Sequence, residues 1–468
     1  MNSKCGGYDF DVAVIGGGSG GYAAARTAAA NGLKTVVIEG GKEVGGLCIL
    51  RGCMPTKALL YAAEVRHVAQ YAGLWGMKPG DVPFDWAAVM ARKDGLIREF
   101  AGYRVEQLND GRFQFIRAQA QFTDPHTLAL STGETLSAAH FVISTGSVVA
   151  PAPLPQLGSV GFLTSDEALA PERPPKSLLV LGGGAVAMEF AQFFARFDVK
   201  VTVLQRSARV LREFDGDAAA EIARVFEREG IEVWTGTMLT DAWRDGALKG
   251  VTFLHEGKQK RIEAEEILFA LGRSPNTSSL ALAEAGVTMD KGRVVTDERM
   301  RTNVPHIYAA GDCTGPHEIV HIAIQQGEVA AYNIAHPEGS RRVDYRLLLS
   351  VVFTEPQIAT VGLTEQEAAA RGVRYLAASY RFADHGKSMI MEARDGFVKL
   401  LADPITGEIL GGACVGPVGG ELIHEIVVAM AKRMTVQELA AVPHYHPTLA
   451  EIWTYPAETL MERVGTKS

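Results

Sequence analysis

The chain of 468 residues has few cysteines, no long apolar run and no excess of basic charge. Five cysteines are too few for a disulfide scaffold in so long a chain, so we expect one reactive pair in a reducing compartment. No apolar run of about eighteen residues is present, which predicts no membrane span. A formal charge of −8, without a basic stripe, argues against nucleic acid as a partner. We therefore predict a cytoplasmic protein of roughly two to four domains.

What the chain does contain is a cysteine pair in the segment GGLCILRGCMPTK, with four residues between Cys48 and Cys53. A turn of that length can bring two sulfurs within bonding distance. Glycines such as Gly46 allow close backbone approach to a ligand, and Lys57 is expected to favour a thiolate by lowering its pKa. This pattern predicts a redox-active disulfide. The alternatives are two structural cysteines or half of a zinc site, although zinc needs two further ligands and normally a shorter gap, so no metal site is predicted.

A dinucleotide-binding unit is predicted at the amino terminus. Residues 10–15 indicate a buried strand, residues 19–31 an alanine-rich helix, and residues 35–38 a second strand. The turn between the first strand and the helix, GGGSGG, has the GxGxxG spacing that binds a pyrophosphate at a helix amino terminus. Glu39 follows the second strand, where a carboxylate can accept a hydrogen bond from a ribose hydroxyl. The glycines at the three motif positions are Gly16, Gly18 and Gly21.

The same pattern returns far downstream in KSLLVLGGGAVAMEFAQFFARFDVKVTVLQRS, which indicates a second dinucleotide site. Proline-rich segments between residues 151 and 176 predict a domain crossing near residue 150. At the position where the first unit has its acid, this unit has an uncharged glutamine followed by Arg206, with Arg212 in the next loop. Guanidinium groups pair with a 2′-phosphate, so NADPH is favoured over NADH, the alternative being that both arginines are solvated surface charges. The motif residues are Gly182, Gly184 and Ala187.

Five segments in order give the chain a family resemblance: GGGSGG with Glu39, the cysteine loop, GGGAVAMEF, TNVPHIYAAGD ending at Asp312, and HYHPTLAE. The chain resembles the flavoprotein disulfide reductases, a family that includes dihydrolipoamide dehydrogenase, glutathione reductase and mercuric ion reductase. The resemblance implies an α/β fold with two Rossmann-like dinucleotide-binding domains and a C-terminal α+β dimerisation domain. The implied domains are an FAD domain in two parts (1–150 and 273–345), an NAD(P) domain (151–272) and an interface domain (346–468).

The resemblance also implies roles for individual residues. Cys53 would be the thiol nearer the flavin, and Cys48 the thiol that exchanges with substrate. Lys57 would lie near the flavin and pair with Glu189. His446 would be the acid–base group, oriented by Glu451, and the pair would reach the cysteines of the opposite subunit of a homodimer. Residues implied to bind FAD or NAD(P) at the crossover segments are Thr145, Gly146, Asp312 and Gly272.

From the residues alone, Asp312 has an alternative role. It is an acid that follows a buried strand, and it could cap the helix after it. For His446, the corresponding alternative is a turn histidine before Pro447.

The substrate is the most open question. Mercury is disfavoured, because MERVGTKS lacks a cysteine pair and His446 is present. Glutathione is disfavoured, because Glu328 stands where the resemblance requires an arginine, and Arg26 could lie on a solvated helix face. The leading expectation is a dihydrolipoamide dehydrogenase-like enzyme acting on lipoamide or a low-molecular-weight thiol. The alternatives are an NADPH-dependent reductase of glutathione or another small disulfide, a flavin-dependent quinone reductase or oxidase, and a non-enzymatic structural subunit.

Overall fold

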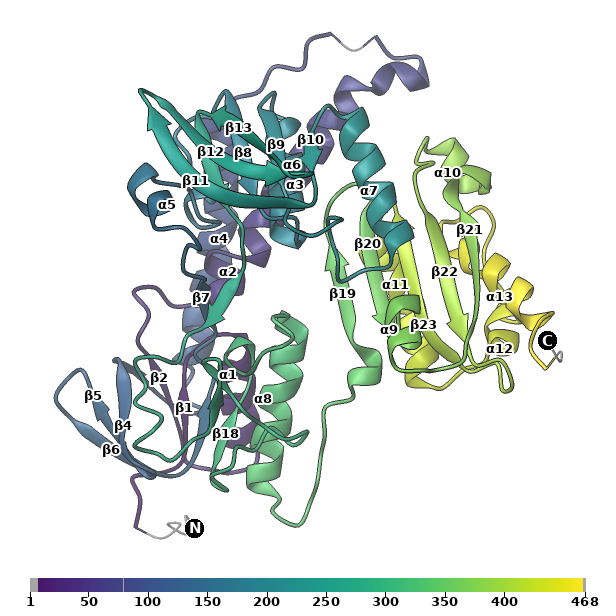
Figure 1. The fold of residues 1–468 in the computed structure, drawn as a ribbon. Coiled ribbons are helices and arrows are strands. Elements are labelled where there is room, and N and C mark those ends of the chain that lie inside the picture. Colours follow the sequence, from purple (N-terminus) through teal and green to yellow (C-terminus); the bar gives the residue numbers. More distant parts are fainter. Residues whose placement is uncertain (1–6, 79, 466–468) are drawn as a thin grey trace. The chain divides into compact units, whose positions relative to one another are not determined.

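The computed structural model describes residues 7–78 and 80–465, and the chain divides into two compact units (Figure 1). Each unit is assembled from three stretches of sequence, so segments far apart in the chain share one core. The first unit comprises Met1–Ala58, Met90–Pro151 and Gly272–Val343, and the second comprises Leu59–Val89, Ala152–Leu271 and Asp344–Ser468. The finer domain boundaries predicted at residues 150, 272 and 345 stay a prediction.

The first unit is built on a seven-stranded sheet in the order β3-β2-β1-β6-β5-β4, with β18 also paired to β6. The pairings among β3, β2, β1, β6 and β18 are parallel, and those among β4, β5 and β6 are antiparallel. Parallel strands are covered on both faces, which explains their runs of valine and isoleucine. The strands are β1 (Phe10–Ile15), β2 (Thr35–Glu39), β3 (Gln114–Arg117), β4 (Ala120–Asp124), β5 (Thr127–Leu130), β6 (Thr135–Ile143) and β18 (Ile307–Ala309).

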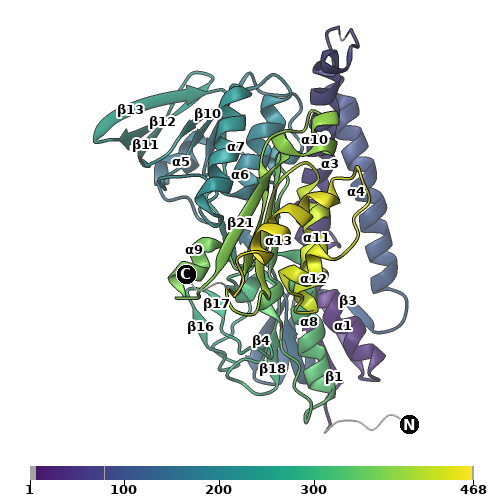
Figure 2. The ribbon, with the colours of Figure 1, turned by 90° about the vertical axis from the view of Figure 1, so that its right-hand side faces the viewer.

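Two helices, α1 (Ser19–Ala30) and α8 (Val320–Ala335), pack side by side in this unit (Figure 2). A Cβ atom on Gly327 would lie 2.2 Å from the carbonyl oxygen of Gly20, so the close approach of the helices requires glycine there. The predicted strand, helix and strand at the amino terminus are confirmed. The shorter elements are α2 (Gly46–Leu50), β7 (Ser147–Val149) paired with β15 (Arg273–Pro275), β16 (Met289–Asp290) paired with β17 (Arg293–Val294), and η3 (Asp312–Thr314).

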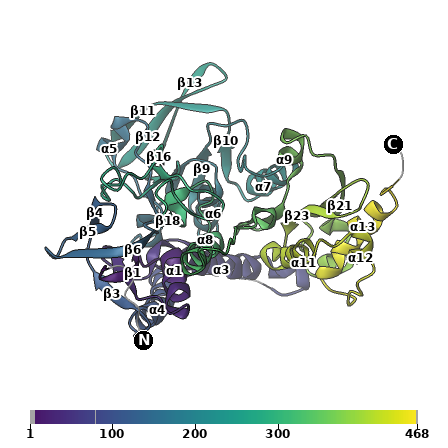
Figure 3. The ribbon, with the colours of Figure 1, turned by 90° about the horizontal axis from the view of Figure 1, so that it is seen from below.

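The second unit contains a four-stranded parallel sheet in the order β10-β9-β8-β14 and an antiparallel sheet in the order β11-β12-β13 (Figure 3). Helix α6 (Ala185–Ala195) follows β8 directly, as the second glycine motif predicts. The other elements here are α5 (Pro155–Val160), η2 (Glu167–Leu169), β8 (Ser177–Leu181), β9 (Lys200–Leu204), α7 (Gly216–Arg228), β10 (Glu232–Trp234), β11 (Thr237–Asp245), β12 (Leu248–His255), β13 (Lys258–Ala264) and β14 (Glu266–Phe269).

The carboxy-terminal part of the second unit is a five-stranded antiparallel sheet in the order β19-β20-β23-β22-β21. Two helices here begin with capping boxes, at Thr364 with Glu367 and at Thr435 with Glu438. Trp453 is fully buried in the core of this part. Its strands are β19 (Leu349–Val352), β20 (Gln357–Gly362), β21 (Leu376–Arg381), β22 (Phe397–Ala402) and β23 (Ile409–Gly416). Its helices are η4 (Tyr345–Leu347), α9 (Glu365–Ala370), η5 (Phe382–Asp384), α10 (Gly386–Ile390), α11 (Gly419–Ala431), α12 (Val436–Ala440), η6 (Ala450–Trp453) and α13 (Thr454–Met461).

Two long helices, α3 (Cys53–Gln70) and α4 (Trp86–Leu108), each contribute residues to both units, with η1 (Ala72–Trp75) between them. Neither these helices nor any other in the described ranges is long and apolar enough to cross a membrane.

Candidate functional site

The amino-terminal glycine loop joins β1 to α1 in a conformation that only glycine tolerates. Gly16 has a φ of +105°, and a Cβ atom there would lie 2.2 Å from the carbonyl oxygen of Ser144. A Cβ on Gly21 would lie 1.9 Å from the carbonyl oxygen of Gly16. Gly18 is the residue that precedes the first turn of α1 and has no side chain there. The loop therefore presents bare backbone N–H groups at a helix amino terminus, as a pyrophosphate requires.

Glu39 ends β2 and lies against this loop. Its Oε2 accepts a hydrogen bond from the backbone N–H of Gly17 at 2.8 Å, and its Oε1 accepts one from Gly41 at 2.6 Å. The carboxylate is therefore held at the carboxyl edge of the parallel sheet, next to the glycine turn, which is where a dinucleotide ribose binds.

The cysteine loop meets the glycine loop backbone to backbone. Gly46 has a φ of +72°, and a Cβ atom on it would lie 2.7 Å from the Cα of Gly18. Cys48 lies in α2, which begins at Gly46, and Cys53 begins α3. The two predicted redox residues are thus placed next to the predicted pyrophosphate loop by a contact that leaves no room for a side chain.

Cys48 and Cys53 are both thiols in the structure, and a side-chain hydrogen bond links them. This hydrogen bond, followed by burial, raises the pKa of Cys48 well above its usual range, because both effects favour the protonated form. Lys57 acts in the expected direction and lowers the pKa of Cys48, but its effect is smaller. In the reduced pair, the effect of Lys57 on the pKa of Cys48 is therefore outweighed by the hydrogen bond with Cys53 and by burial.

The crossover segments meet around Asp312. Ser147 Oγ donates to Asp312 Oδ2 at 2.7 Å, and Arg273 Nε donates to Ser147 Oγ at 2.8 Å. No side chain caps η3, which begins at Asp312, so the alternative role as a cap for that short helix is not observed. The Oγ1 of Thr145 is buried and has no hydrogen-bond partner among the described residues. Gly146 and Gly272 both have positive φ, +71° and +116°, which bends the backbone here.

An unpaired buried hydroxyl and a glycine cradle fit an FAD molecule, whose ribityl and pyrophosphate groups supply matching polar atoms. The residues that would hold it in this unit are Gly16, Gly18, Gly21, Glu39, Gly46, Thr145, Gly146 and Asp312.

The second glycine loop has the same geometry as the first. Gly182 has a φ of +118°, and a Cβ atom on it would lie 2.2 Å from the carbonyl oxygen of Ala270. Gly184 precedes the first turn of α6, and Ala187 is buried within that helix. Glu189, also in α6, is buried and accepts a hydrogen bond from the backbone N–H of Phe353 at 2.9 Å.

The two arginines predicted to bind a 2′-phosphate differ in their surroundings. Arg206 is exposed two residues after the end of β9, and its side chain forms no ion pair with another described residue. Arg212 is also exposed, but its Nε lies 3.3 Å from Glu213 Oε1. A third arginine of this loop, Arg209, was not predicted from the sequence. Its Nη2 donates to the carbonyl oxygen of Phe214 at 2.8 Å and so stabilises the loop. Arg206 is therefore the better placed of the two predicted arginines.

His446 and Glu451, the two residues predicted to provide acid–base chemistry, lie in contact. His446 Nδ1 lies 3.0 Å from Glu451 Oε2, with the histidine side chain 77% exposed and the glutamate side chain 10% exposed. Glu451 lies in η6, next to the buried Trp453, so the carboxylate is fixed while the imidazole faces outward. Such a pair fixes the orientation of the imidazole ring.

A second histidine, His385, contacts the same carboxylate and was missed by sequence reasoning. Its side chain is fully buried, its Nδ1 lies 2.9 Å from Ser388 Oγ, and its Nε2 lies 3.3 Å from Glu451 Oε1 without hydrogen-bond geometry. Burial lowers the pKa of His385, while Glu451 raises it to a smaller extent. No spacing rule joins two residues this far apart, so only the fold could reveal the contact.

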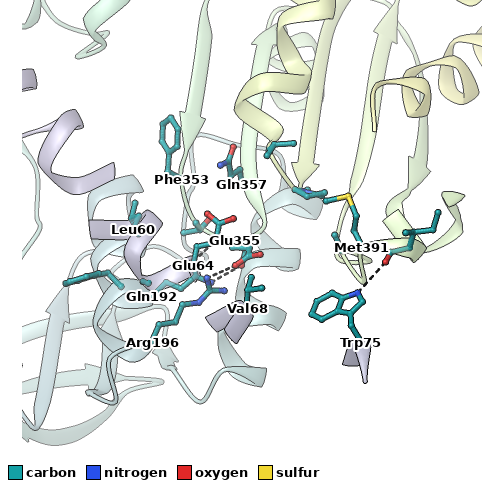
Figure 4. Close-up of a pocket in the computed structure, with 18 residues that line it drawn as sticks. Leu60, Glu64, Val68, Trp75, Gln192, Arg196, Phe353, Glu355, Gln357 and Met391 are labelled. Atoms are coloured by element: carbon teal, nitrogen blue, oxygen red, sulfur yellow. Dashed lines mark hydrogen bonds and ion pairs between the residues drawn. The ribbon is translucent and has the colours of Figure 1, made fainter. Parts of the chain in front are cut away.

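A cavity of about 550 Å³ lies in the second unit between α3, α6 and the carboxy-terminal sheet (Figure 4). Arg196 lines it and forms ion pairs with Glu229 at 2.7 Å and Glu355 at 2.5 Å. Burial raises the pKa of Glu64, a second charged residue of the lining. None of the predicted site residues lines this cavity.

The comparisons with known proteins agree with this geometry. Residues 10–327 match the family model "Pyridine nucleotide-disulphide oxidoreductase", and residues 348–457 match its "dimerisation domain". The chain is 34% identical to dihydrolipoyl dehydrogenase from Geobacillus stearothermophilus, over 96% of each chain. It is 35% identical to mercuric reductase from Streptomyces lividans, over 98% of each chain.

Among solved structures, the chain is similar to the HOCl-induced flavoprotein disulfide reductase RclA from Escherichia coli. The TM-score is 0.85 at 26% identity, covering 96% of this chain and 99% of that one. These matches confirm the predicted α/β fold class with a carboxy-terminal dimerisation domain, and they confirm the family resemblance.

Proposed function

Because the chain belongs to the pyridine nucleotide-disulphide oxidoreductases, a family of FAD enzymes, we propose that Cys48 and Cys53 form its redox-active pair. The enzyme moves electrons between NAD(P)H, FAD, this pair and a small dithiol or disulfide, most like a dihydrolipoamide dehydrogenase. The observation that carries the proposal is the contact of Gly46 with Gly18, which holds the cysteine loop against the dinucleotide loop. Its expected site of action is the cytoplasm, where thiols are kept reduced.

FAD, held by the first glycine loop and the cysteine loop, would supply the chemistry that carries two electrons from the nicotinamide to the Cys48–Cys53 disulfide. His446 takes the proton of Cys48, whose thiolate then attacks one sulfur of the substrate disulfide; a mixed disulfide forms and one substrate thiolate leaves. His446 gives that thiolate its proton, and Glu451 stabilises the imidazolium before the transfer. Cys53 attacks the mixed disulfide at Cys48, which restores the internal disulfide and releases the second thiol. The reverse sequence oxidises a dithiol.

Lys57 and Glu189 complete the proposed catalytic set, as a pair beside the flavin. The proposed enzyme is a homodimer in which His446 of the partner subunit serves these cysteines, and the match of residues 348–457 to a dimerisation domain supports this.

For the nicotinamide, we favour NADPH over NADH. The support is that residue 205, whose side chain lies against Gly183 of the second glycine loop, is a glutamine and not an acid, and that the Arg206 that follows it is exposed. A carboxylate at the end of β9 would repel a 2′-phosphate, and a glutamine does not. The residues proposed to bind this cofactor are Gly182, Gly184, Ala187, Arg206, Arg212 and Gly272.

For the substrate, lipoamide or another small dithiol is favoured over glutathione. Arg26, the basic residue considered for a glutathione carboxylate, forms an ion pair with Glu328. Its charge is therefore already neutralised within the unit. Steady-state rates with lipoamide, glutathione disulfide and a quinone, each with NADH and NADPH, distinguish the candidates.

The proposal is tested at His446. We expect His446→Gln to slow disulfide turnover at least about a hundredfold, the lower range for loss of a general acid, while NADPH still reduces the flavin at its normal rate in stopped flow. His444→Gln is the matched control, because His444 is a neighbouring histidine with its own carboxylate, Glu425, at 2.6 Å. Unchanged disulfide turnover in His446→Gln removes the residue from the mechanism. Two results together would instead support the quinone reductase alternative. The wild-type enzyme would show no disulfide activity, and the Cys48→Ser variant would still reduce quinone at the full rate.

A further inference from the structure

The carboxylate of Glu451 lies between two imidazoles in the carboxy-terminal part of the second unit. Its Oε2 atom lies 3.0 Å from Nδ1 of His446, and its Oε1 atom lies 3.3 Å from Nε2 of His385. No third group in residues 7–78 and 80–465 forms a hydrogen bond or an ion pair with this carboxylate. The backbone of η6 does not fix the two oxygens, because a glutamate side chain has rotatable bonds of its own. The two histidines are therefore the polar contacts that position the carboxylate.

Only one of these two histidines is itself held in place. The side chain of His446 is 77% exposed, whereas that of His385 is fully buried. The ring of His385 packs against Phe382 and Tyr455, at centroid distances of 6.5 Å and 6.3 Å, and its Nδ1 lies 2.9 Å from Ser388 Oγ. Packing and a hydrogen bond lock a side chain in one rotamer, which a surface position does not. His385 is therefore the fixed contact of the carboxylate.

The surroundings of His385 also decide where its proton lies. Burial lowers the pKa of His385 by more than Glu451 raises it, which favours the neutral ring. A neutral imidazole carries its proton on one nitrogen and a lone pair on the other. A lone pair on Nε2 would face the oxygens of Glu451 and be repelled, so the proton belongs on Nε2. The hydroxyl of Ser388 then donates to Nδ1.

We propose that His385 is a positioning residue for the acid–base pair: its Nε2–H holds Oε1 of Glu451, so that Oε2 stays on Nδ1 of His446. The inference rests on the proposed role of His446 and adds a residue that touches neither substrate nor cofactor. A carboxylate orients a catalytic imidazole only if the carboxylate is itself held, and an exposed histidine cannot hold it. The hydroxyl of Ser388 serves the same end, because it keeps the proton of His385 on Nε2.

The first test uses two amides that each preserve one nitrogen of the ring. The amide nitrogen of glutamine lies near the position of Nε2, and that of asparagine lies near the position of Nδ1. We expect His385→Asn to slow the oxidation of the reduced holoenzyme by oxidised lipoamide about five- to twentyfold in stopped flow, less than the loss of His446 itself. His385→Gln, which keeps a donor toward Glu451, should stay within about twofold of wild type. Flavin reduction by NADPH should be unchanged in both variants.

His444→Asn is the matched control, because the side chain of His444 is only 8% exposed and has its own carboxylate, Glu425, at 2.6 Å. The proposal is overturned if this control slows the disulfide reaction as much as His385→Asn does. It is also overturned if His385→Asn and His385→Gln have the same rate, because a residue that only fills space does not distinguish the two amides. Equal slowing of flavin reduction would indicate a general loss of structure and would overturn it too.

The second test needs no turnover, so it separates this inference from the proposed function. In crystal structures of the holoenzyme variants, we expect the distance from Oε2 of Glu451 to Nδ1 of His446 to exceed about 3.5 Å in His385→Asn and to be unchanged in His385→Gln. An unmoved carboxylate in His385→Asn overturns the proposal. If the wild-type enzyme reduces no disulfide, the proposed function fails, while the position of Glu451 still decides the role of His385.

Ser388→Ala covers the case in which His385→Asn does not fold, because it removes one oxygen atom and leaves the ring in place. Without the hydroxyl, the ring is free to carry its proton on Nδ1 instead of Nε2. We expect this variant to slow the oxidation by oxidised lipoamide about threefold, with flavin reduction unchanged. An unchanged rate of oxidation in Ser388→Ala would then overturn the proposal.

Discussion

Replacing Gly46 with alanine tests the contact that joins the cysteine loop to the dinucleotide loop. Gly46 has a φ of +72°, so an alanine there costs about 1–2 kcal/mol in backbone strain. Its Cβ would also lie 2.7 Å from the Cα of Gly18, and overpacking of this kind costs about a further 1–3 kcal/mol. The nearest atoms all belong to the backbone of Gly18 and not to the end of a flexible side chain, so the two loops must separate.

We therefore expect Gly46→Ala to lower the free energy of unfolding by about 2–5 kcal/mol and to weaken FAD retention. Urea denaturation measures the first quantity. The ratio of flavin to protein absorbance after gel filtration, with fluorescence of the released flavin, measures the second. Because the displaced loop carries Cys48, the proposed electron transfer from the flavin to the Cys48–Cys53 disulfide should slow as well.

Gly32→Ala is the matched control. Gly32 has a φ of +80° in the same unit, but a Cβ atom on it would meet nothing within 4 Å. The variant therefore carries the backbone strain without the clash, and we expect it to keep its FAD. If Gly46→Ala is no less stable than Gly32→Ala and binds FAD as tightly, the contact of the two loops does not position the site.

Two further predictions concern the second unit. Arg206→Gln should lower kcat/KM for NADPH about five- to tenfold while leaving NADH within twofold, because an exposed arginine–phosphate contact is worth roughly 1 kcal/mol. An unchanged NADPH-to-NADH ratio would assign Arg206 to the solvated surface. Burial lowers the pKa of His385, so the unfolded chain binds a proton that the folded protein does not. The free energy of unfolding should therefore fall as the pH drops below about 6.5, by at most about 1.4 kcal/mol per pH unit from this group. His385→Asn should reduce that slope between pH 7.5 and 5.5 in urea denaturation, and an identical slope would contradict the assignment.

Much of the fold could be predicted because its signals are local. The first strand, turn and helix were recognised from a buried apolar run and the GxGxxG spacing, and β1 and α1 match those ranges almost residue for residue. Gly16 and Gly182 were identified from their place in that motif, and each closes against a carbonyl oxygen of the neighbouring strand end. Local sequence suffices here because a tight strand-to-helix turn can be made by very few residue types.

Contacts between distant segments could not be predicted in this way. His385 meets Glu451 because α10 and η6 are brought together by the carboxy-terminal sheet. The ion pair of Arg26 with Glu328 depends on the packing of α1 against α8, and the sequence showed only a basic residue and an acidic one far apart. Even the influence of Lys57 on the pKa of Cys48 was predicted in sign but not in outcome, because the hydrogen bond between the two thiols and burial have larger effects.

By itself, the sequence determined which chemical groups this protein has: a pair of thiols with four residues between them, two glycine turns and a histidine five residues before a glutamate. Those patterns are set by short-range geometry, so they survive without knowledge of the fold. Only the tertiary structure decided which charges are neutralised: Arg26 is paired with Glu328, whereas Nε and Nη1 of Arg104, near the ring of Tyr22, have no hydrogen-bond partner among the described residues. The energy of a charge depends on every group around it, and those groups come from all parts of the chain.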